Sequence, residues 1–145
     1  MRDLPRQLTA DELAELFEGR TRFVEVLAGT ESPLDHAREI AAGLSEEDKK
    51  AILDAHPPIG GKPTSARSMR EQGTDDDPEV LAELARLNAE YEEKFGFRFV
   101  VFVNRRPRRE VVPILRERID RTREEELETG VDELVQIAVA RWRTS

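Results

Sequence analysis

Apolar residues recur three and four positions apart along most of this chain, the spacing that places them on one face of an α-helix. A long helix is predicted after Asp77-Pro78-Glu79, where an acidic N-cap is followed by a proline suited to the first turn, and Gly96 is expected to end it. The stripe of this helix comprises Leu81, Leu84, Asn88, Tyr91 and Phe95. A second stripe, near the C-terminus, comprises Leu127, Val131, Leu134 and Ala138.

Helix-start signals indicate further elements. Thr9-Ala10-Asp11-Glu12 and Thr122-Arg123-Glu124-Glu125 are capping boxes, in which the threonine and the last glutamate each bond the other's backbone N–H. Ser32-Pro33 and Ser45-Glu46-Glu47-Asp48 are predicted to begin two more helices. Val112-Pro113 is predicted to begin another, because proline is tolerated in the first turn of a helix and not in its interior.

One segment departs from the helical pattern. Phe97 to Val103 is apolar and rich in β-branched residues, so its composition favours a strand. A single strand has no partner, and we therefore expect this segment to be buried as extended or irregular chain, or to be drawn into a helical turn. Residues 1–145 are thus predicted to form one all-α domain, a bundle of about six to eight helices without a significant sheet.

Charge and composition exclude several classes of partner. The 145 residues carry a formal net charge of −8, whereas phosphate binding needs a basic surface or stripe, so no nucleic acid is expected. The most basic run, Asn104-Arg105-Arg106-Pro107-Arg108-Arg109, is interpreted as a solvated turn. The chain has no cysteine and no apolar run long enough to span a membrane. A soluble, cytoplasmic protein without a membrane partner is therefore expected.

His56 is the first candidate for acid–base chemistry. It is expected to end a helix, because Pro57 disfavours the helical conformation in the residue before it. Histidine titrates near neutral pH, so His56 could be a general acid or base, or it could be an inert residue at a helix end. The other histidine, His36, lies beside Asp35 and Arg38 and is interpreted as a surface residue. No metal site is expected from two histidines in unrelated contexts.

Polar residues at helical spacing provide further candidates. Ser68, Glu71 and Gln72 share one face of a short predicted helix, where they could bind a polar ligand or face solvent. Pairing with Glu71 would fix the tautomer of His56 and favour its charged form. Arg141 extends the apolar stripe of the C-terminal helix. It either points into the core or a pocket, where it needs an anionic partner, or it lies exposed in a frayed last turn.

In their order along the chain, these residues resemble the 2-oxo-4-hydroxy-4-carboxy-5-ureidoimidazoline (OHCU) decarboxylase family of uric acid degradation. The most specific stretch is Leu87-Asn88-x-x-Tyr91-x-x-Lys94-Phe95-Gly96-Phe97-x-Phe99-Val100. The other matching elements are His56-Pro57, Ser68-x-x-Glu71-Gln72, Arg118-Ile119, Glu126-Leu127 and Ile137-x-x-x-Arg141. The resemblance covers the chain from about Phe23 to Arg141.

The resemblance implies an all-α homodimer that needs no cofactor and decarboxylates OHCU to (S)-allantoin in purine catabolism. It implies that His56 and Glu71 are the catalytic pair. The residues that it implies for substrate binding are Pro57, Ser68, Gln72, Arg141 and the pocket-lining Phe99, Val100 and Val101, the last three partly through main-chain groups.

The loop from Pro57 to Pro63 departs from the family pattern. The segment between the His-Pro turn and the Glu-Gln helix is shorter than is usual, and Gly73-Thr74-Asp75-Asp76-Asp77 replaces the usual Ala-Gly-Leu. The protein could therefore be a decarboxylase or lyase of a related ureido or imidazoline acid. A second alternative is a non-catalytic helical paralogue that acts as a binding module.

Overall fold

The fold is built from helices. The computed structural model describes residues 3–56, 77–103 and 106–144, and in these ranges it contains seven α-helices and no strand, which confirms the all-α prediction. The first four are α1 (Ala10–Phe17), α2 (Arg22–Ala28), α3 (Pro33–Ala42) and α4 (Glu46–Ala55). The others are α6 (Pro78–Phe95), α7 (Arg108–Ile119) and α8 (Arg123–Thr144).

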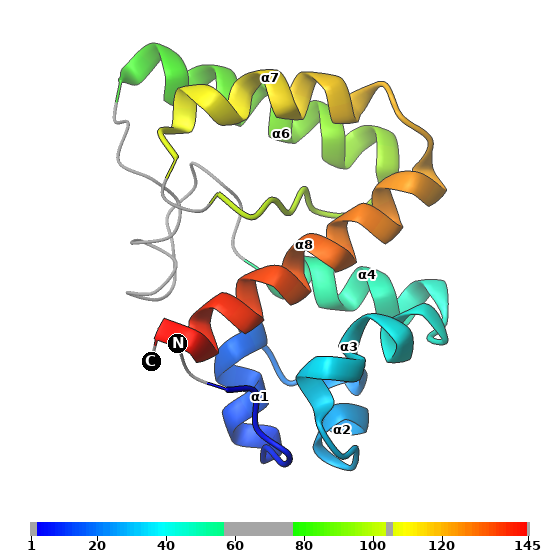
Figure 1. The fold of residues 1–145 in the computed structure, drawn as a ribbon. Coiled ribbons are helices and arrows are strands. Elements are labelled where there is room, and N and C mark those ends of the chain that lie inside the picture. The colour runs from blue at the N-terminus through cyan, green and yellow to red at the C-terminus, as the bar shows by residue number, and fades with distance from the viewer. Residues whose placement is uncertain (1–2, 57–76, 104–105, 145) are drawn as a thin grey trace.

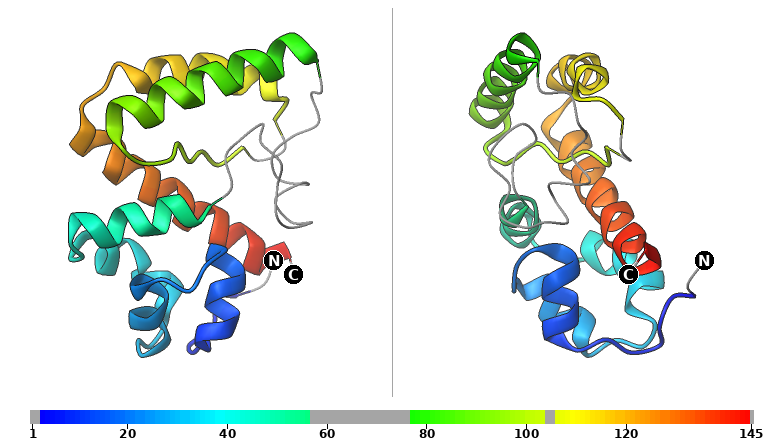
Figure 2. Two further views of the ribbon diagram at one scale, coloured as in Figure 1. Left: turned by 180° about the vertical axis from the view of Figure 1, so that it is seen from behind. Right: turned by 90° about the vertical axis from the view of Figure 1, so that its left-hand side faces the viewer.

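The long helix α8 crosses the molecule and organises it (Figure 1). It contacts α1, α3 and α4, while α6 and α7 pack against each other on the opposite side of the extended segment 97–103. The two helices of this pair run in the same direction, because segment 97–103 carries the chain back to the end where α6 began (Figures 1 and 2).

Segment 97–103 is extended and buried, which is one of the two outcomes expected for it. Phe97, Phe99 and Val103 are all buried, and no strand pairs with this segment in the described part of the chain. The ring centroids of Phe97 and Phe99 lie 6.0 and 5.3 Å from that of Tyr91 on α6, in edge-on geometry. Helices on both sides of the segment bury these side chains, and this burial stabilises the segment without a sheet.

Side-chain caps begin three helices as predicted. The Thr9 hydroxyl accepts the Glu12 N–H at 3.1 Å, and the Glu12 carboxylate accepts the Thr9 N–H at 3.0 Å. Thr122 and Glu125 make the same reciprocal pair at 3.2 and 3.1 Å before α8. Ser45 accepts a backbone N–H of the first turn of α4 at 3.2 Å. These bonds satisfy N–H groups that have no partner inside a helix.

One predicted helix start is confirmed without its side-chain cap, and another is corrected. Ser32 does precede α3, but its backbone is left-handed, with φ 51°, and its side chain makes no cap hydrogen bond. α7 begins at Arg108 and not at Val112, so Pro113 lies inside the helix instead of in its first turn. Val112 is buried in the core, and the packing of α7 on α6 outweighs the loss of one backbone donor at Pro113.

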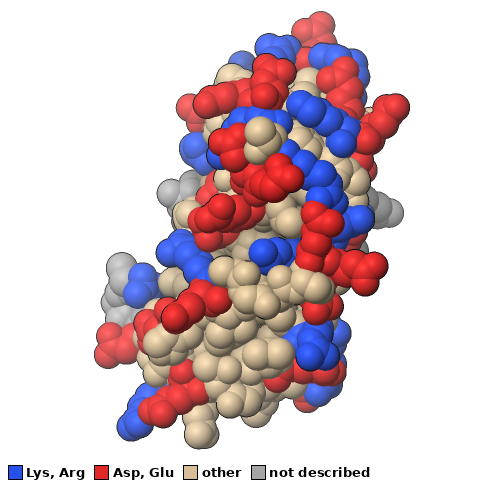
Figure 3. All heavy atoms as spheres, turned by 90° about the vertical axis from the view of Figure 1, so that its right-hand side faces the viewer, with Lys and Arg blue, Asp and Glu red and all other residues tan. Residues whose placement is uncertain are grey.

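The basic run before α7 is only partly a turn. Arg108 and Arg109 are the first residues of α7, and half-buried Arg106 donates to the carbonyls of Phe102 and Val103 at 2.7 and 2.8 Å. In the view of Figure 3, acidic and basic side chains are mixed over the upper half, and the lower middle of this face consists mainly of other residues. None of the described helices combines the length and apolar character needed to cross a membrane.

Candidate active site

His56 lies directly after α4, as the following proline predicted. The last helical residue is Ala55, and the backbone of His56 is extended, with φ −82° and ψ 136°. The residue is only 7% exposed, and its buried Nδ1 has no hydrogen-bond partner within the part of the chain that the structure describes. Because an unpartnered buried polar atom is costly, Nδ1 is a position where a ligand or a further side chain can bond.

The surroundings of His56 favour its neutral form. Burial is the main cause that lowers the pKa of His56 from 6.5 to about 4. The positive charge of Arg141 lowers it further, the carboxylate of Glu18 raises it, and Arg98 lowers it. The charged form predicted from the sequence depends on Glu71, which lies outside the described residues.

Arg141 points into the fold, so its exposed alternative is wrong. The residue is 2% exposed and continues the buried stripe of α8. Its Nη1 donates to the Leu16 carbonyl and its Nη2 to Glu18 Oε1, both at 2.8 Å. The Leu16 carbonyl belongs to the last turn of α1, where carbonyls lack partners within the helix. Arg141 therefore joins α8 to the end of α1 and has the anionic partner that its position required.

Glu18 is a member of this cluster that the sequence analysis missed. It caps α1 in the left-handed conformation, with φ 60° and ψ 28°, which glycine usually occupies. Glycine instead occupies the next position, because a Cβ at Gly19 would lie only 2.9 Å from the Cβ of Ala55. This close approach of α1 to the end of α4 brings Glu18 into the surroundings of His56.

Arg98 fastens the extended segment to the same end of α4. Its Nη1 donates to the carbonyls of His56 and Asp54 at 2.6 and 2.8 Å, and its backbone N–H donates to Asp54 Oδ1 at 3.0 Å. These bonds satisfy carbonyls at the C-terminal end of α4, where a cation is also favoured by the helix dipole. Arg98 occupies an unspecified position of the sequence motif, so no pattern signalled it.

A second arginine, Arg118, bonds to the segment that is predicted to line the pocket. Phe99, Val100 and Val101 are all buried. Arg118 Nη1 donates to the Val100 carbonyl at 2.7 Å, and its guanidinium lies 4.6 Å from the centroid of the Phe99 ring. The Val100 carbonyl is thus already engaged within the fold, which limits the main-chain contacts that this wall can offer a substrate.

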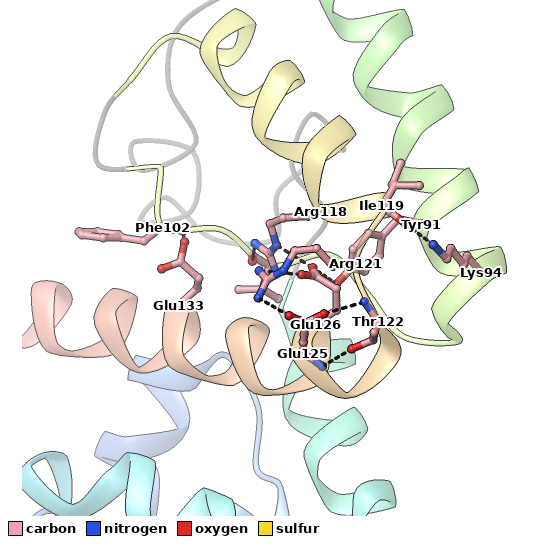
Figure 4. A network of polar contacts seen from close by, with 11 residues as sticks. Tyr91, Lys94, Phe102, Arg118, Ile119, Arg121, Thr122, Glu125, Glu126 and Glu133 are labelled. Carbon is pink, nitrogen blue, oxygen red and sulfur yellow. Dashed lines mark hydrogen bonds and ion pairs between the residues drawn. The ribbon is translucent and has the colours of Figure 1, made fainter.

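Glu126 anchors this second arginine (Figure 4). Its fully buried carboxylate accepts Arg118 Nε at 2.7 Å and the Tyr91 hydroxyl at 2.8 Å, and Arg121 Nη1 lies 3.1 Å from Oε2. Burial raises the pKa of Tyr91 above its ordinary value, so this hydroxyl stays protonated and donates. The network ties α6, α7 and α8 to the extended segment.

The structure thus brings together part of the predicted site. His56 and Arg141 share one buried cluster, and Phe99, Val100 and Val101 follow Arg98, which bonds to His56. Four other predicted site residues lie outside the described residues, namely Pro57, Ser68, Glu71 and Gln72. The shortened loop 57–63 also lies outside them.

The remaining candidates take no part in this cluster. His36 lies at the surface of α3, as predicted, with its Nδ1 3.6 Å from Glu39. Within the described ranges, no group of three or more histidine, aspartate or glutamate side chains is arranged to hold a metal ion.

Known proteins resemble this chain over most of its length. The family model for OHCU decarboxylase matches residues 2–143. The 2-oxo-4-hydroxy-4-carboxy-5-ureidoimidazoline decarboxylase of Mus musculus is 31% identical over 120 residues, which are 77% of this chain and 67% of the mouse protein. The uric acid degradation bifunctional protein PucL of Bacillus subtilis (strain 168) is 27% identical over 149 residues, 95% of this chain but 30% of that protein.

Two solved structures share the fold. A crystal structure of OHCU decarboxylase in the presence of (S)-allantoin has a TM-score of 0.76 and 26% identity, covering 90% of this chain and 94% of that one. A crystal structure of (S)-allantoin synthase has a TM-score of 0.69 and 22% identity, covering 93% of this chain and 48% of that one. The second likeness concerns the fold alone.

Proposed function

This chain belongs to the OHCU decarboxylase family, and we propose that it catalyses the cofactor-independent decarboxylation of 2-oxo-4-hydroxy-4-carboxy-5-ureidoimidazoline to (S)-allantoin in uric acid degradation. The family makes it a carboxy-lyase. The observation that best supports the proposed site is the buried Nδ1 of His56, which has no hydrogen-bond partner among the described residues and on which the charge of Arg141 acts. Both residues occupy positions to which the family resemblance assigns a role.

The substrate itself can accept the electrons that decarboxylation releases. The bond to the carboxylate breaks and CO₂ leaves. The electron pair forms a C=C bond between the two ring carbons and displaces the C=N pair onto the ring nitrogen, which takes up a proton from solvent. A second proton then adds to the ureido-bearing ring carbon, and the hydroxyl loses its proton to become a carbonyl. Addition from one face produces (S)-allantoin, and the enzyme has to orient the carboxylate and place this proton.

His56 and Arg141 are proposed to divide these tasks. A neutral imidazole can accept the proton of the substrate hydroxyl, and the resulting imidazolium can act as an acid later in the reaction. The planar guanidinium of Arg141 orients a carbonyl or carboxylate oxygen of the substrate. Glu71 is proposed to hold His56, and Pro57, Ser68, Gln72 and the Phe99–Val101 wall are proposed to complete the substrate contacts.

The stereochemistry of the product tests this function. Urate oxidase and hydroxyisourate hydrolase generate the substrate from urate in the same cuvette, and circular dichroism records the appearance of enantiopure allantoin. We expect the protein to accelerate this signal and to yield the (S) enantiomer. A product that forms no faster than without the protein would disprove the proposal and favour the non-catalytic binding module.

A pair of histidine variants locates the chemistry. His56→Ala should remove most of the turnover, whereas His36→Ala, which alters the exposed histidine of α3, should leave it unchanged. Wild-type rates in His56→Ala would refute the role of His56. Acceleration with a related ureido or imidazoline acid and not with OHCU would indicate that the substrate class is different.

The assembly and location of the protein are also proposals. We propose that residues 1–145 form a single OHCU decarboxylase-like domain, that the protein acts as a homodimer in the cytoplasm, and that it needs no cofactor. Sedimentation of the purified protein measures its oligomeric state directly, and a monomer at micromolar concentration would exclude the dimer.

A further inference from the structure

Glu18 is unusual because its backbone is strained and its carboxylate is buried inside the protein. A left-handed backbone costs free energy for any residue with a side chain, and such strain persists only where the surrounding structure holds it in place. Here φ is 60°, and the side chain is only 7% exposed. Its partner, the Arg141 side chain, is 1% exposed, and their polar atoms are 2.8 Å apart.

The ion pair of Glu18 and Arg141 joins α1 to α8 and also fixes the orientation of the guanidinium. Arg141 Nη1 already bonds α1 through the Leu16 carbonyl, so this tie does not require a carboxylate. The carboxylate of Glu18 engages the other terminal nitrogen, Nη2, and thereby fixes the plane of the guanidinium. It also supplies the negative charge that a buried guanidinium requires.

The pair lies close enough to His56 to influence it. Gly19, next to Glu18, approaches Ala55 so closely that an added Cβ would lie 2.9 Å from the Cβ of Ala55. The charges of Glu18 and Arg141 both act on the His56 imidazole, in opposite directions. A change in either member therefore alters the balance at the histidine.

We infer that Glu18 is a positioning residue of the decarboxylase site, which holds Arg141 in one orientation and offsets its charge beside His56. This inference rests on the proposed function. Within the described residues, the charged groups that act on His56 are Glu18 from the end of α1, Arg141 from α8 and Arg98 from the extended segment. Glu18 is the one acidic group among them.

Three variants with one control test this role at neutral pH and across a pH series. Glu18→Gln keeps the shape of the side chain and removes its charge, whereas Glu18→Asp keeps the charge on a shorter side chain. Asp11→Asn is the control, because Asp11 is an exposed residue of α1 that also pairs with an arginine, Arg20, at 2.9 Å. Glu18→Gly removes the carboxylate and relieves the left-handed strain, which provides a folded variant if Glu18→Gln is unstable.

Glu18→Gln should lower kcat/KM on the order of 10- to 100-fold, mainly through KM, because Arg141 is no longer held where the substrate needs it. Loss of the carboxylate removes the negative charge that raises the pKa of His56, so the limb of the pH profile that depends on His56 should move to lower pH. Glu18→Asp should recover part of the loss, and Asp11→Asn should match the wild type. Glu18→Gly should behave as Glu18→Gln does.

Several results would overturn the inference while leaving the proposed function intact. One is a wild type that produces (S)-allantoin together with a folded Glu18→Gln or Glu18→Gly variant of unchanged KM and pH profile, since Glu18 would then be structural only. Another is a variant with a lower KM, since Glu18 would then compete with the substrate for Arg141. If the wild type itself produces no (S)-allantoin, it is the proposed function that fails.

Discussion

The neutral, buried state of His56 predicts how the stability of the protein depends on pH. The unfolded chain should bind a proton at His56 near pH 6.5, whereas the folded protein should bind it only near pH 4. Between these values the unfolded state binds more protons, so the free energy of unfolding should decrease as the pH falls. His56→Gln removes the titrating group and keeps a polar side chain, and it should abolish this part of the pH dependence.

The size of the effect follows from the pKa difference. A shift of one pKa unit corresponds to about 1.4 kcal/mol, and the shift of His56 from 6.5 to about 4 is fully expressed only below the lower value. From pH 7 to pH 5 the wild type should therefore lose about 2 kcal/mol more stability than His56→Gln, a loss large enough to measure. Carboxylates that titrate in both proteins cancel in this difference.

Urea unfolding of both proteins at pH 7, 6 and 5 measures the difference, and a proton NMR titration assigns the His56 resonance by its absence from the variant. Parallel stability curves would show that the folded state does not lower the pKa of His56, which would refute the reasoning from burial. A wild type that gains stability relative to the variant on acidification would show a raised pKa. That result would instead favour the charged His56 that the sequence predicted through Glu71.

Three further substitutions test the packing around the site by urea unfolding. Gly19→Ala should destabilise the protein by about 1–3 kcal/mol, because the new Cβ would meet that of Ala55 at 2.9 Å; unchanged stability would contradict this close approach. Tyr91→Phe removes a 2.8 Å hydrogen bond to buried Glu126 and should cost about 1–2 kcal/mol, and a cost near zero would show that this bond contributes nothing net. Arg118→Met should cost about 3–5 kcal/mol, since it removes a buried partner of the same carboxylate; a loss below about 1 kcal/mol would indicate that Arg121 alone compensates the charge.

Local signals in the sequence predicted most helix ends. The caps formed by Thr9, Ser45 and Thr122 depend on bonds between a side chain and a backbone N–H three residues away, so the sequence contains both partners. The end of α4 at His56 depends on the proline that follows it. The apolar stripe of α8 likewise placed Arg141 on the buried face, as one of two alternatives. Periodicity and capping therefore determined the all-α class and the principal candidates.

Packing decided the features that local signals could not. Pro113 lies inside α7 because burial against α6 outweighs a local rule, and the extended segment 97–103 is stabilised by helices on both sides of it. Glu18 and Arg141 are separated by 123 positions, and no periodicity connects them.

The chemical state of His56 also belongs to the tertiary structure. The sequence identified a histidine before a proline turn, and a histidine by itself could be charged or neutral at pH 7. Its desolvation and the balance between Arg141 and Glu18 exist only after three distant segments have packed together. The sequence thus determined which residue could carry the chemistry. The tertiary structure decided whether that residue is charged or neutral, because electrostatic energies depend on distances in space and not on positions along the chain.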